Sequence, residues 1–189
     1  MPVIIIEGGE LVGKTSIIRA LQDKIPYHTL IKLSGYPTST ISSTYSRACD
    51  VAGQYDLMMP IIEKFARDRI RTLIFDRFCT TEKIMFPTSF SVGNMDIYLD
   101  HAAQYGVEQF ILTAPDNVLE VRHSERVKSC DLERQQLSSI LKVHEQYRRE
   151  AADTPLITRL VDNDGSKSPS DIALEVIKLA NIPLYSITD

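Results

Sequence analysis

An apolar run, a glycine-bounded loop and a helix follow one another near the start of the chain. Residues 3–7 (VIIIE) are β-branched and apolar, which predicts a fully buried strand. Residues 8–15 (GGELVGKT) follow directly and fit the pattern GxxxxGK[ST]. Residues 14–24 then carry apolar side chains at helical spacing and stop before Pro26. A buried strand that leads through such a loop into a helix is typical of an α/β fold.

The glycine pattern indicates a cradle for phosphate groups. Glycines let the backbone turn back, so that successive N–H groups point at phosphate oxygens, and the helix N-terminus adds partial positive charge. Lys14 supplies a cation to the β- and γ-phosphates, and the Thr15 hydroxyl is a ligand for Mg²⁺. We therefore predict a nucleoside triphosphate site formed by Gly8, Gly9, Glu10, Leu11, Val12, Gly13, Lys14, Thr15 and Ser16.

Glu10 is an unexpected carboxylate inside this loop. It would repel a bound nucleotide if it faced the phosphates. We therefore predict that it points across the cleft, towards an acceptor hydroxyl or a basic side chain. The alternative is that Glu10 is a solvated loop residue without a role.

The rest of the chain continues the alternation of strands and helices. Its apolar runs are short and continuous, which is typical of a parallel sheet covered by helices on both faces. We predict further strands at residues 28–33, 72–75, 109–113 and 156–161, and helices at 56–69, 94–106, 131–151 and 169–180, with another from Pro115. Residues 34–46 and 78–93 are predicted to be irregular. The expected architecture is one α/β domain, residues 1–189, with five parallel strands.

Asp76 and Arg77 come directly after the strand predicted at residues 72–75. Open parallel sheets bind their ligands at the carboxyl ends of the strands. A carboxylate there holds Mg²⁺ directly or through water, so Thr15 and Asp76 are the predicted metal ligands. Arg77 is suited to binding a phosphoryl group, since its guanidinium pairs with oxyanions in a bidentate way. The alternative is a structural ion pair or a capped turn.

Arg122 and Arg126 lie four residues apart and share one face of a predicted helix. They mark a small lid at roughly residues 120–135, which would close over the triphosphate, exclude water and neutralise charge. A salt-bridged surface face is the alternative. With Lys14, Asp76 and Arg77, these two arginines complete the predicted catalytic set.

Composition excludes several classes of protein. Of the 189 residues, 43% are hydrophobic and 24% are charged, so the chain can bury a core. The apolar run at residues 3–6 is far shorter than the roughly 18 residues that a membrane span requires. No basic residues precede this run, as they would in a secretory signal. The net charge of −4 gives no reason to expect binding to nucleic acid. Three widely spaced cysteines indicate buried thiols in a reducing cytoplasm.

Six segments together resemble the thymidylate kinase family of nucleoside monophosphate kinases. The first is residues 6–15 with the acidic Glu10, and the second is residues 74–78 (IFDRF), a strand followed by Asp-Arg-aromatic. The others are the proline, helix and arginines of residues 115–126, the helix at 143–151, the strand end at 160–162 and the last helix around 176–177. The resemblance covers most of the chain and implies a P-loop kinase fold.

The resemblance also implies roles for individual residues. Lys14, Thr15 and the loop backbone would bind ATP, with Mg²⁺ as the metal, and a homodimer is expected. Glu10 would contact the acceptor sugar, and Arg77 the acceptor phosphate. Arg122 and Arg126 would be lid residues, as in the family variant whose catalytic arginine lies in the lid.

The acceptor side departs from the family pattern. The family's Arg-Glu-Pro-Gly-Gly turn is missing, and residues 33–37 read LSGYP. The arginine-bearing helix that faces the acceptor base in the family has no clear counterpart between Arg47 and Pro60. The candidates for the acceptor pocket are Tyr45, Arg47, Gln54, Tyr55 and Asp56.

Three functions are compatible with these residues. The first is Mg²⁺-dependent transfer of the ATP γ-phosphoryl group to a deoxynucleoside monophosphate, dTMP or a related pyrimidine, and the substrate's own phosphate makes a general base unnecessary. The second is a kinase for a hydroxyl of a deoxynucleoside or of a nucleotide within DNA, with Asp76 or Glu10 as base. The third is a GTP-driven switch; the Asn-Lys-x-Asp motif of such proteins is absent, and only residues 50–53 (DVAG) fit the looser Asp-x-x-Gly.

Overall fold

Five parallel strands form the centre of the molecule. The computed structural model describes residues 2–33, 44–68, 71–129 and 136–183. The strand order is β2-β3-β1-β4-β5, and every neighbouring pair is parallel. The strands are β1 (Val3–Glu7), β2 (His28–Lys32), β3 (Thr72–Asp76), β4 (Glu108–Thr113) and β5 (Ile157–Asp162). All five carboxyl ends therefore meet at one edge of the sheet, with the end of β3 beside the end of β1.

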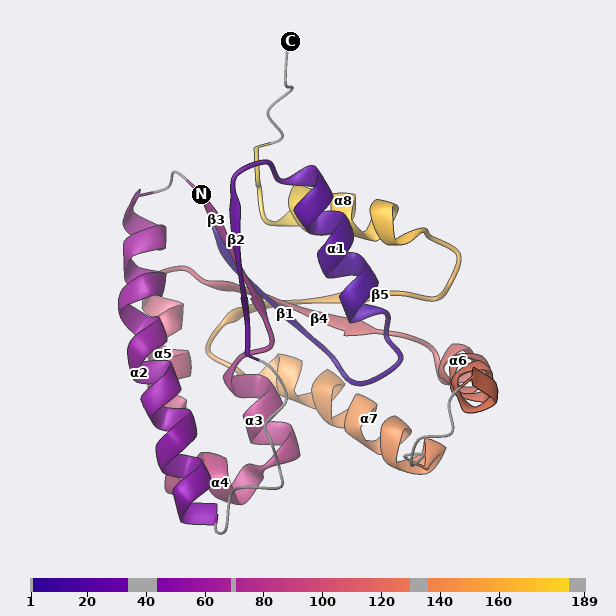
Figure 1. Ribbon diagram of the computed structural model, residues 1–189, viewed down its shortest axis with the longest axis horizontal. Coiled ribbons are helices and arrows are strands. Elements are labelled where there is room, and N and C mark those ends of the chain that lie inside the picture. The colour runs from indigo at the N-terminus through magenta and orange to yellow at the C-terminus, as the bar shows by residue number, and fades with distance from the viewer. Residues whose placement is uncertain (1, 34–43, 69–70, 130–135, 184–189) are drawn as a thin grey trace.

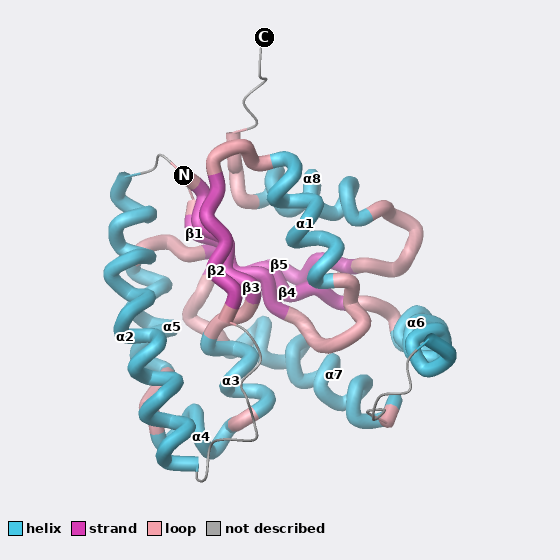
Figure 2. The backbone as a smooth tube through the Cα atoms, in the orientation of Figure 1, coloured by secondary structure: helices cyan, strands magenta, loops and turns pink. Residues whose placement is uncertain are grey.

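Helices cover both faces of this sheet (Figures 1 and 2). One face carries α1 (Lys14–Lys24) and α8 (Pro169–Leu179), and the other carries α2 (Thr44–Asp68) and α5 (Asp96–Gln104). The shorter α3 (Cys79–Met85) and α4 (Pro87–Val92) pack beside α2, and α3 also packs on α7 (Leu137–Asp153). The remaining helix is α6 (Asp116–Ser129), which contacts α7.

Alternate side chains of β1 enter two separate cores. Ile4 and Ile6 pack in the core beneath α1 and α8, whereas Val3 and Ile5 pack in the core beneath α2 and α5. Successive side chains of a strand point to opposite faces, so Glu7 continues the row of Val3 and Ile5. The carboxylate that ends β1 is thereby directed into the interior on the α2 side.

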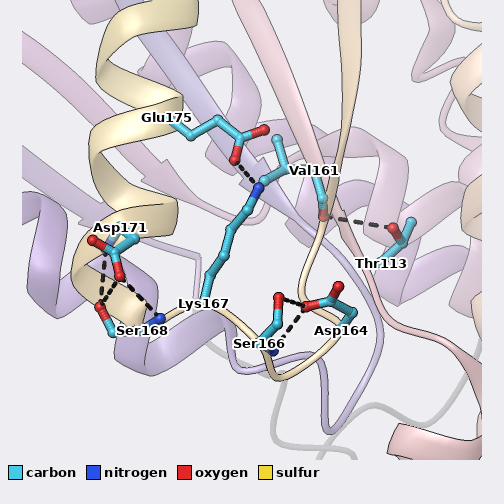
Figure 3. A network of polar contacts seen from close by, with 8 residues as sticks. All are labelled: Thr113, Val161, Asp164, Ser166, Lys167, Ser168, Asp171 and Glu175. Atoms are coloured by element: carbon cyan, nitrogen blue, oxygen red, sulfur yellow. Dashed lines mark hydrogen bonds and ion pairs between the residues drawn. The ribbon is translucent and has the colours of Figure 1, made fainter.

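The last helix begins with a complete capping box. Ser168 accepts a hydrogen bond from the backbone N–H of Asp171, whose carboxylate accepts from the N–H of Ser168 (Figure 3). Pro169 occupies the first helical position, where no backbone donor is needed. Lys167, just before the helix, forms an ion pair with Glu175, which lies one helical turn after Asp171. The predicted start of this helix at 168–169 is confirmed.

The predicted fold class is confirmed, since the structure is α/β with five parallel strands. Each predicted strand lies within one residue of its observed bounds, and Gly106 has the left-handed backbone expected at a helix end, with φ 66°. No helix in the described ranges is long and apolar enough to cross a membrane.

The prediction that residues 78–93 are irregular is wrong. This segment folds into α3 and α4, of seven and six residues. Helices this short contain fewer than two full turns, so their sequence shows no apolar period. Pro87 marks the first turn of α4 and not a loop, because proline fits where the helix leaves N–H groups unpaired anyway.

The predicted bounds and buried face of α2 also need correction. The helix begins at Thr44 and not near residue 56, so the end of the loop predicted at residues 34–46 is helical, and residues 34–43 lie outside the described residues. The buried apolar side chains of the helix are Ala48, Val51, Tyr55, Met59 and Ile62. Leu57, which the apolar spacing places on the buried face, is 70% exposed. Cys49 on the same helix is exposed as well, contrary to the expected buried thiol.

Two other details of the helices differ from prediction. Asn94 does not cap α5: it has a left-handed backbone with φ 49°, and Met95 takes the N-cap position. α7 starts at Leu137, and residues 131–135, which the sequence assigns to the same helix, lie outside the described residues.

Candidate functional site

The phosphate loop, residues 8–15, requires glycine at two points. Gly8 has φ 140°, and a Cβ there would lie 2.8 Å from the carbonyl oxygen of Leu112 on β4. Gly13 has φ 82°, and a Cβ there would lie 2.6 Å from the Asn163 side-chain nitrogen. Both positions combine a left-handed backbone with a close neighbour, so a side chain would deform the loop. The glycines of the motif thus let the chain reverse between β1 and α1.

The carbonyl groups on the outer side of this loop are held by two side chains. Arg122 Nη1 donates to the carbonyl of Leu11 at 3.0 Å, and Asn163 Nδ2 donates to that of Val12 at 2.8 Å. In a planar trans peptide the C=O and the following N–H point in opposite directions. The N–H groups of Val12 and Gly13 are therefore turned away from these partners, which frees them for an anion.

Lys14 and Asp76 form an ion pair next to the loop. Lys14 Nζ donates to Asp76 Oδ1 at 3.1 Å, and the two side chains are only 10% and 9% exposed. The pairing follows from the sheet, because Asp76 lies opposite Ile6 in the β1–β3 register. Burial lowers the pKa of Lys14, and the nearby Arg77 guanidinium lowers it further. A buried cation beside the loop is positioned to attract phosphate oxygens.

Thr15 and Asp76 provide the kind of donors that Mg²⁺ prefers. Thr15 is exposed at the first turn of α1, and the Asp76 carboxylate lies beside the Lys14 head group. Both offer oxygen atoms, and Mg²⁺ in such sites is held by few protein groups together with phosphate oxygens. Within the described ranges no three His, Cys, Asp or Glu side chains gather as a metal cage. The donor set fits a metal that arrives with a nucleotide.

Arg77 has an unusual backbone conformation. Its φ is +77°, a region that costs a residue with a Cβ roughly 1 kcal/mol. The Arg77 N–H donates to the carbonyl of Ile6 at 3.0 Å, which holds the turn against β1. Its side chain lines a cleft together with the loop residues Gly8, Gly9 and Glu10. The strained backbone therefore accompanies a cation that faces the phosphate loop.

Glu7 is a buried carboxylate directly behind the loop, and it was not among the site residues predicted from the sequence. Its side chain is fully buried, and it accepts hydrogen bonds from the N–H of Phe78 at 2.7 Å and the Thr81 hydroxyl at 2.5 Å. Burial raises the pKa of Glu7 to about 7, against the lowering effect of these hydrogen bonds and of the nearby Lys14 and Arg77.

Both arginines predicted in the lid reach the phosphate loop from α6. Arg122 bonds to the loop carbonyl described above and also donates to Asn163 Oδ1 at 3.1 Å. Arg126 Nη1 lies 3.1 Å from Glu10 Oε2, and both of these side chains are well exposed. The expectation that Glu10 faces a basic residue thus agrees with the structure. Residues 130–135 of the proposed lid lie outside the described residues.

α7 forms the far wall of the cleft at the loop. Ile140, Val143 and Tyr147 line it opposite the loop, and Met85 of α3 lies beside them. His144 is 1% exposed and packs near Gly9, where a Cβ would lie 3.5 Å from its ring. Neither ring nitrogen of His144 has a hydrogen-bond partner in the part of the chain that the structure describes. Burial lowers the pKa of His144, as does Arg148, so the ring is neutral.

Arg47, one of the acceptor-side candidates, is already engaged inside the protein. It donates to both carboxylate oxygens of Glu82, at 2.8 and 2.9 Å, and its guanidinium lies 3.3 Å from the centre of the Phe86 ring. Arg47 is 7% exposed and Glu82 is fully buried. This pair joins α2 to α3 in a way that a bidentate arginine makes specific.

Tyr55 and Asp56, two further acceptor candidates, are engaged elsewhere than at the phosphate loop. Tyr55 is 1% exposed and packs edge-on against Phe78 in the core. Asp56 accepts a hydrogen bond from the Tyr98 hydroxyl at 2.8 Å, in a groove between α2 and α5. Gln54 is exposed, and the side chain of Tyr45 lies outside the described part of the chain.

The structure thus brings the predicted donor side together and adds two residues to it. Asp76, Arg122 and Arg126 each bond to a residue of the phosphate loop, Lys14 among them, and Arg77 lines the same cleft. Glu7 and Asn163 were missed. Glu7 could have been found as a charged residue that ends an apolar strand, and Asn163 as a polar residue just after the carboxyl end of β5.

Comparison with solved structures shows that this fold occurs in other proteins. The YorR protein of Bacillus subtilis, solved in complex with phosphorylated GDP, matches with a TM-score of 0.63 and 19% identity, over 95% of this chain and 96% of YorR. The tunicamycin resistance protein of Deinococcus radiodurans matches with a TM-score of 0.54 and 14% identity, over 98% of both chains. Thymidylate kinase of Candida albicans matches with a TM-score of 0.49 and 16% identity, over 95% of this chain and 91% of the kinase. This score is too low to establish a shared fold.

No protein-family model and no curated protein sequence matches the chain. The likenesses therefore concern the fold. They support the predicted α/β fold of five parallel strands, and the class of molecule is an α/β protein with a GxxxxGK[ST] loop after its central strand.

The raised pKa of Glu7 predicts a specific dependence of stability on pH. The folded-state pKa of about 7 lies above the ordinary value of 4.5, so the protonated carboxyl favours the folded state. The contribution of Glu7 to the unfolding free energy is therefore complete below about pH 4.5, and it is lost as the pH rises through 7. Relative to Glu7→Gln, the wild type should lose about 3 kcal/mol of unfolding free energy between about pH 4.5 and pH 8. Urea unfolding of both proteins at several pH values measures this difference in unfolding free energy. A difference that does not change with pH would contradict the raised pKa of Glu7.

Proposed function

We propose that this protein transfers the γ-phosphoryl group of ATP, with Mg²⁺, to a deoxynucleoside monophosphate, dTMP or a related pyrimidine. The observation that carries the proposal is the convergence of Arg77, Arg122 and Arg126 on one phosphate loop. Arg122 orders the loop, whereas Arg77 and Arg126 come from separate elements and, added to Lys14, supply more positive charge than binding one triphosphate requires. Phosphoryl transfer between two anionic substrates needs such an excess of positive charge.

In this mechanism the protein positions its substrates and stabilises charge. The loop N–H groups and Lys14 bind the β- and γ-phosphates, and Arg126 neutralises oxygens of the transferred group. Arg122 holds the outer carbonyl side of the loop, so that its N–H groups face the phosphates. Thr15 and Asp76 would hold Mg²⁺, which supplies charge neutralisation at the phosphate oxygens when bound. Arg77 would bind the acceptor phosphate from the end of β3. The acceptor phosphate is already anionic near neutral pH, so no residue has to remove a proton.

Two observations bear on the choice of acceptor. A hydroxyl acceptor would gain from a carboxylate base, and the two candidates, Asp76 and Glu10, each pair with a cation. This favours the monophosphate over the hydroxyl of a nucleoside or of DNA. YorR, which shares the fold, binds a phosphorylated GDP in its structure, so a nucleotide ligand is compatible with this fold.

The homodimer implied by the family resemblance and the cytoplasmic location stay predictions. Leu57 on α2 and Ile97 on α5 are 70% and 56% exposed, and these helices pack against each other. A second copy of the chain would cover apolar side chains there.

The acceptor is tested by a phosphoryl-transfer screen with labelled ATP and Mg²⁺. Deoxynucleoside monophosphates, free deoxynucleosides and a short DNA strand are offered in parallel, with an incubation without acceptor as the control. We expect labelled diphosphate products, with dTMP or another pyrimidine monophosphate as the best acceptor. Label that appears only in a nucleoside or in DNA would replace the proposal with the hydroxyl kinase.

Replacing Arg122 and Arg126 together by Ala should lower kcat roughly 100-fold, because a lid acts in the closed state. It should also weaken ATP binding, since Arg122 holds the Leu11 carbonyl of the phosphate loop. Steady-state kinetics and binding of a fluorescent ATP analogue give the two quantities. Arg149→Ala is a matched control, since Arg149 forms an exposed pair with Glu145 on α7. A double variant that turns over like wild type would show that these arginines form a surface face.

A further inference from the structure

Glu7 joins the phosphate loop to the turn that follows β3. Its backbone leads directly into Gly8, and its carboxylate accepts from the N–H of Phe78 at 2.7 Å. It also accepts from the N–H of Thr81 at 3.3 Å and from the Thr81 hydroxyl at 2.5 Å. All three donors belong to the four residues after Arg77. A carboxylate with no exposed surface that is bonded in this way fixes the turn relative to the loop.

Arg77 lies between two anchors that both come from β1. Its own N–H donates to the carbonyl of Ile6, and the next N–H, that of Phe78, donates to Glu7. Between these two hydrogen bonds the backbone takes φ +77°. A conformation that side chains disfavour persists only where its surroundings hold it. Glu7 supplies the second of the two anchors.

We propose that Glu7 is a positioning residue for phosphoryl transfer, which holds the backbone of Arg77 in its left-handed conformation so that the guanidinium faces the phosphate loop. This inference rests on the function proposed above and adds a residue that acts through Arg77. Glu7 itself touches no substrate, because its carboxylate is enclosed by the turn.

The same carboxylate is connected to the far wall of the cleft. When Glu7 is ionised, the Thr81 hydroxyl donates a hydrogen bond to its carboxylate, and the Tyr147 hydroxyl, 2.8 Å from that of Thr81, is then the donor in the next hydrogen bond. Tyr147 lies on α7 and lines the cleft with the loop. Glu7, Thr81 and Tyr147 therefore hold β1, the turn after β3 and α7 at fixed separations.

Two substitutions of Glu7 separate positioning from folding. Glu7→Ala removes all three accepted hydrogen bonds, and we expect it to lower kcat/KM for the acceptor roughly 10- to 100-fold. ATP affinity, measured with a fluorescent analogue, should change by less than about threefold. In Glu7→Gln the amide oxygen still accepts from the backbone and the amide nitrogen donates to Thr81, so it should recover most of the lost activity. Loss of ATP affinity equal to the loss of turnover would overturn the proposal.

A double-mutant cycle with Arg77→Ala tests whether Glu7 acts through Arg77. If it does, Glu7→Ala combined with Arg77→Ala should be no slower than Arg77→Ala alone. Effects that multiply would show that Glu7 acts by another route, and the proposal would fail.

Two neighbouring threonines provide a matched control. Thr81→Val removes a bond to Glu7, whereas Thr80→Val removes a bond of 2.7 Å to Gln109 on β4. Both side chains are buried, so both variants lose a buried hydroxyl. Only Thr81→Val should reduce acceptor turnover beyond about threefold. Equal losses in the two variants would show a merely structural effect.

An NMR measurement keeps this proposal separate from the proposed function. A residue with positive φ shows a strong NOE between its own amide and Hα protons. The NOE of Arg77 should be strong in wild type and in Glu7→Gln, and weaker in Glu7→Ala. A wild type that phosphorylates no acceptor would refute the proposed function without affecting this readout. An unchanged NOE in Glu7→Ala would refute the positioning role even if transfer is found.

Discussion

The parallel pairing of β1 with β3 determines where Lys14, Asp76 and Arg77 of the candidate site lie. Ile6 lies opposite Asp76 in this pairing, so the phosphate loop and the Asp-Arg pair leave the sheet side by side. The Lys14–Asp76 ion pair and the hydrogen bonds from the turn to Glu7 both span this strand boundary. A shift in register by one residue would separate these partners and turn Glu7 towards the α1 side. The sheet therefore positions the chemistry.

Positive charge in the site is balanced from within the protein. Lys14 pairs with Asp76, Arg126 with Glu10, and Arg122 with loop and Asn163 oxygens. Arranged in this way, the cations are held in place before any anion arrives, which reduces the reorganisation that transfer requires. A triphosphate competes with the carboxylates of Asp76 and Glu10 for Lys14 and Arg126. The affinity for nucleotide then depends on the difference in free energy between the ion pairs with the triphosphate and the internal ion pairs. This affinity should decrease as the salt concentration rises.

The sequence was sufficient for the sheet and for most of the side chains that converge on the phosphate loop, because the patterns that specify them are local. Buried parallel strands appear as short apolar runs, and the turn at Gly8 and Gly13 needs glycine at fixed positions. The same reasoning missed α3 and α4, which are too short to show a period, and it misjudged α2, whose buried face at Ala48, Val51 and Tyr55 is offset from Leu57.

Contacts between distant parts of the chain could not be predicted. Glu7 and Phe78 are separated by 71 residues, and Val12 and Asn163 by 151, so no spacing rule connects them. The acceptor candidates Arg47 and Tyr55 are polar or aromatic, as binding residues are, yet they are buried against Glu82 and Phe78. Residue type suggests which groups can take part in chemistry, whereas packing decides which of them reach the cleft.

Calorimetric titration of ATP with Mg²⁺ is the most direct test that the loop is a triphosphate site. Wild type should bind, and Lys14→Ala should bind at least ~10-fold more weakly, because a buried phosphate-facing cation is lost. Lys24→Ala, at the other end of α1, is the matched control and should bind like wild type. Unfolding temperatures of the three proteins show that the fold is retained. Equal affinity of wild type and Lys14→Ala would contradict the assignment of the phosphate loop, and with it the proposed function.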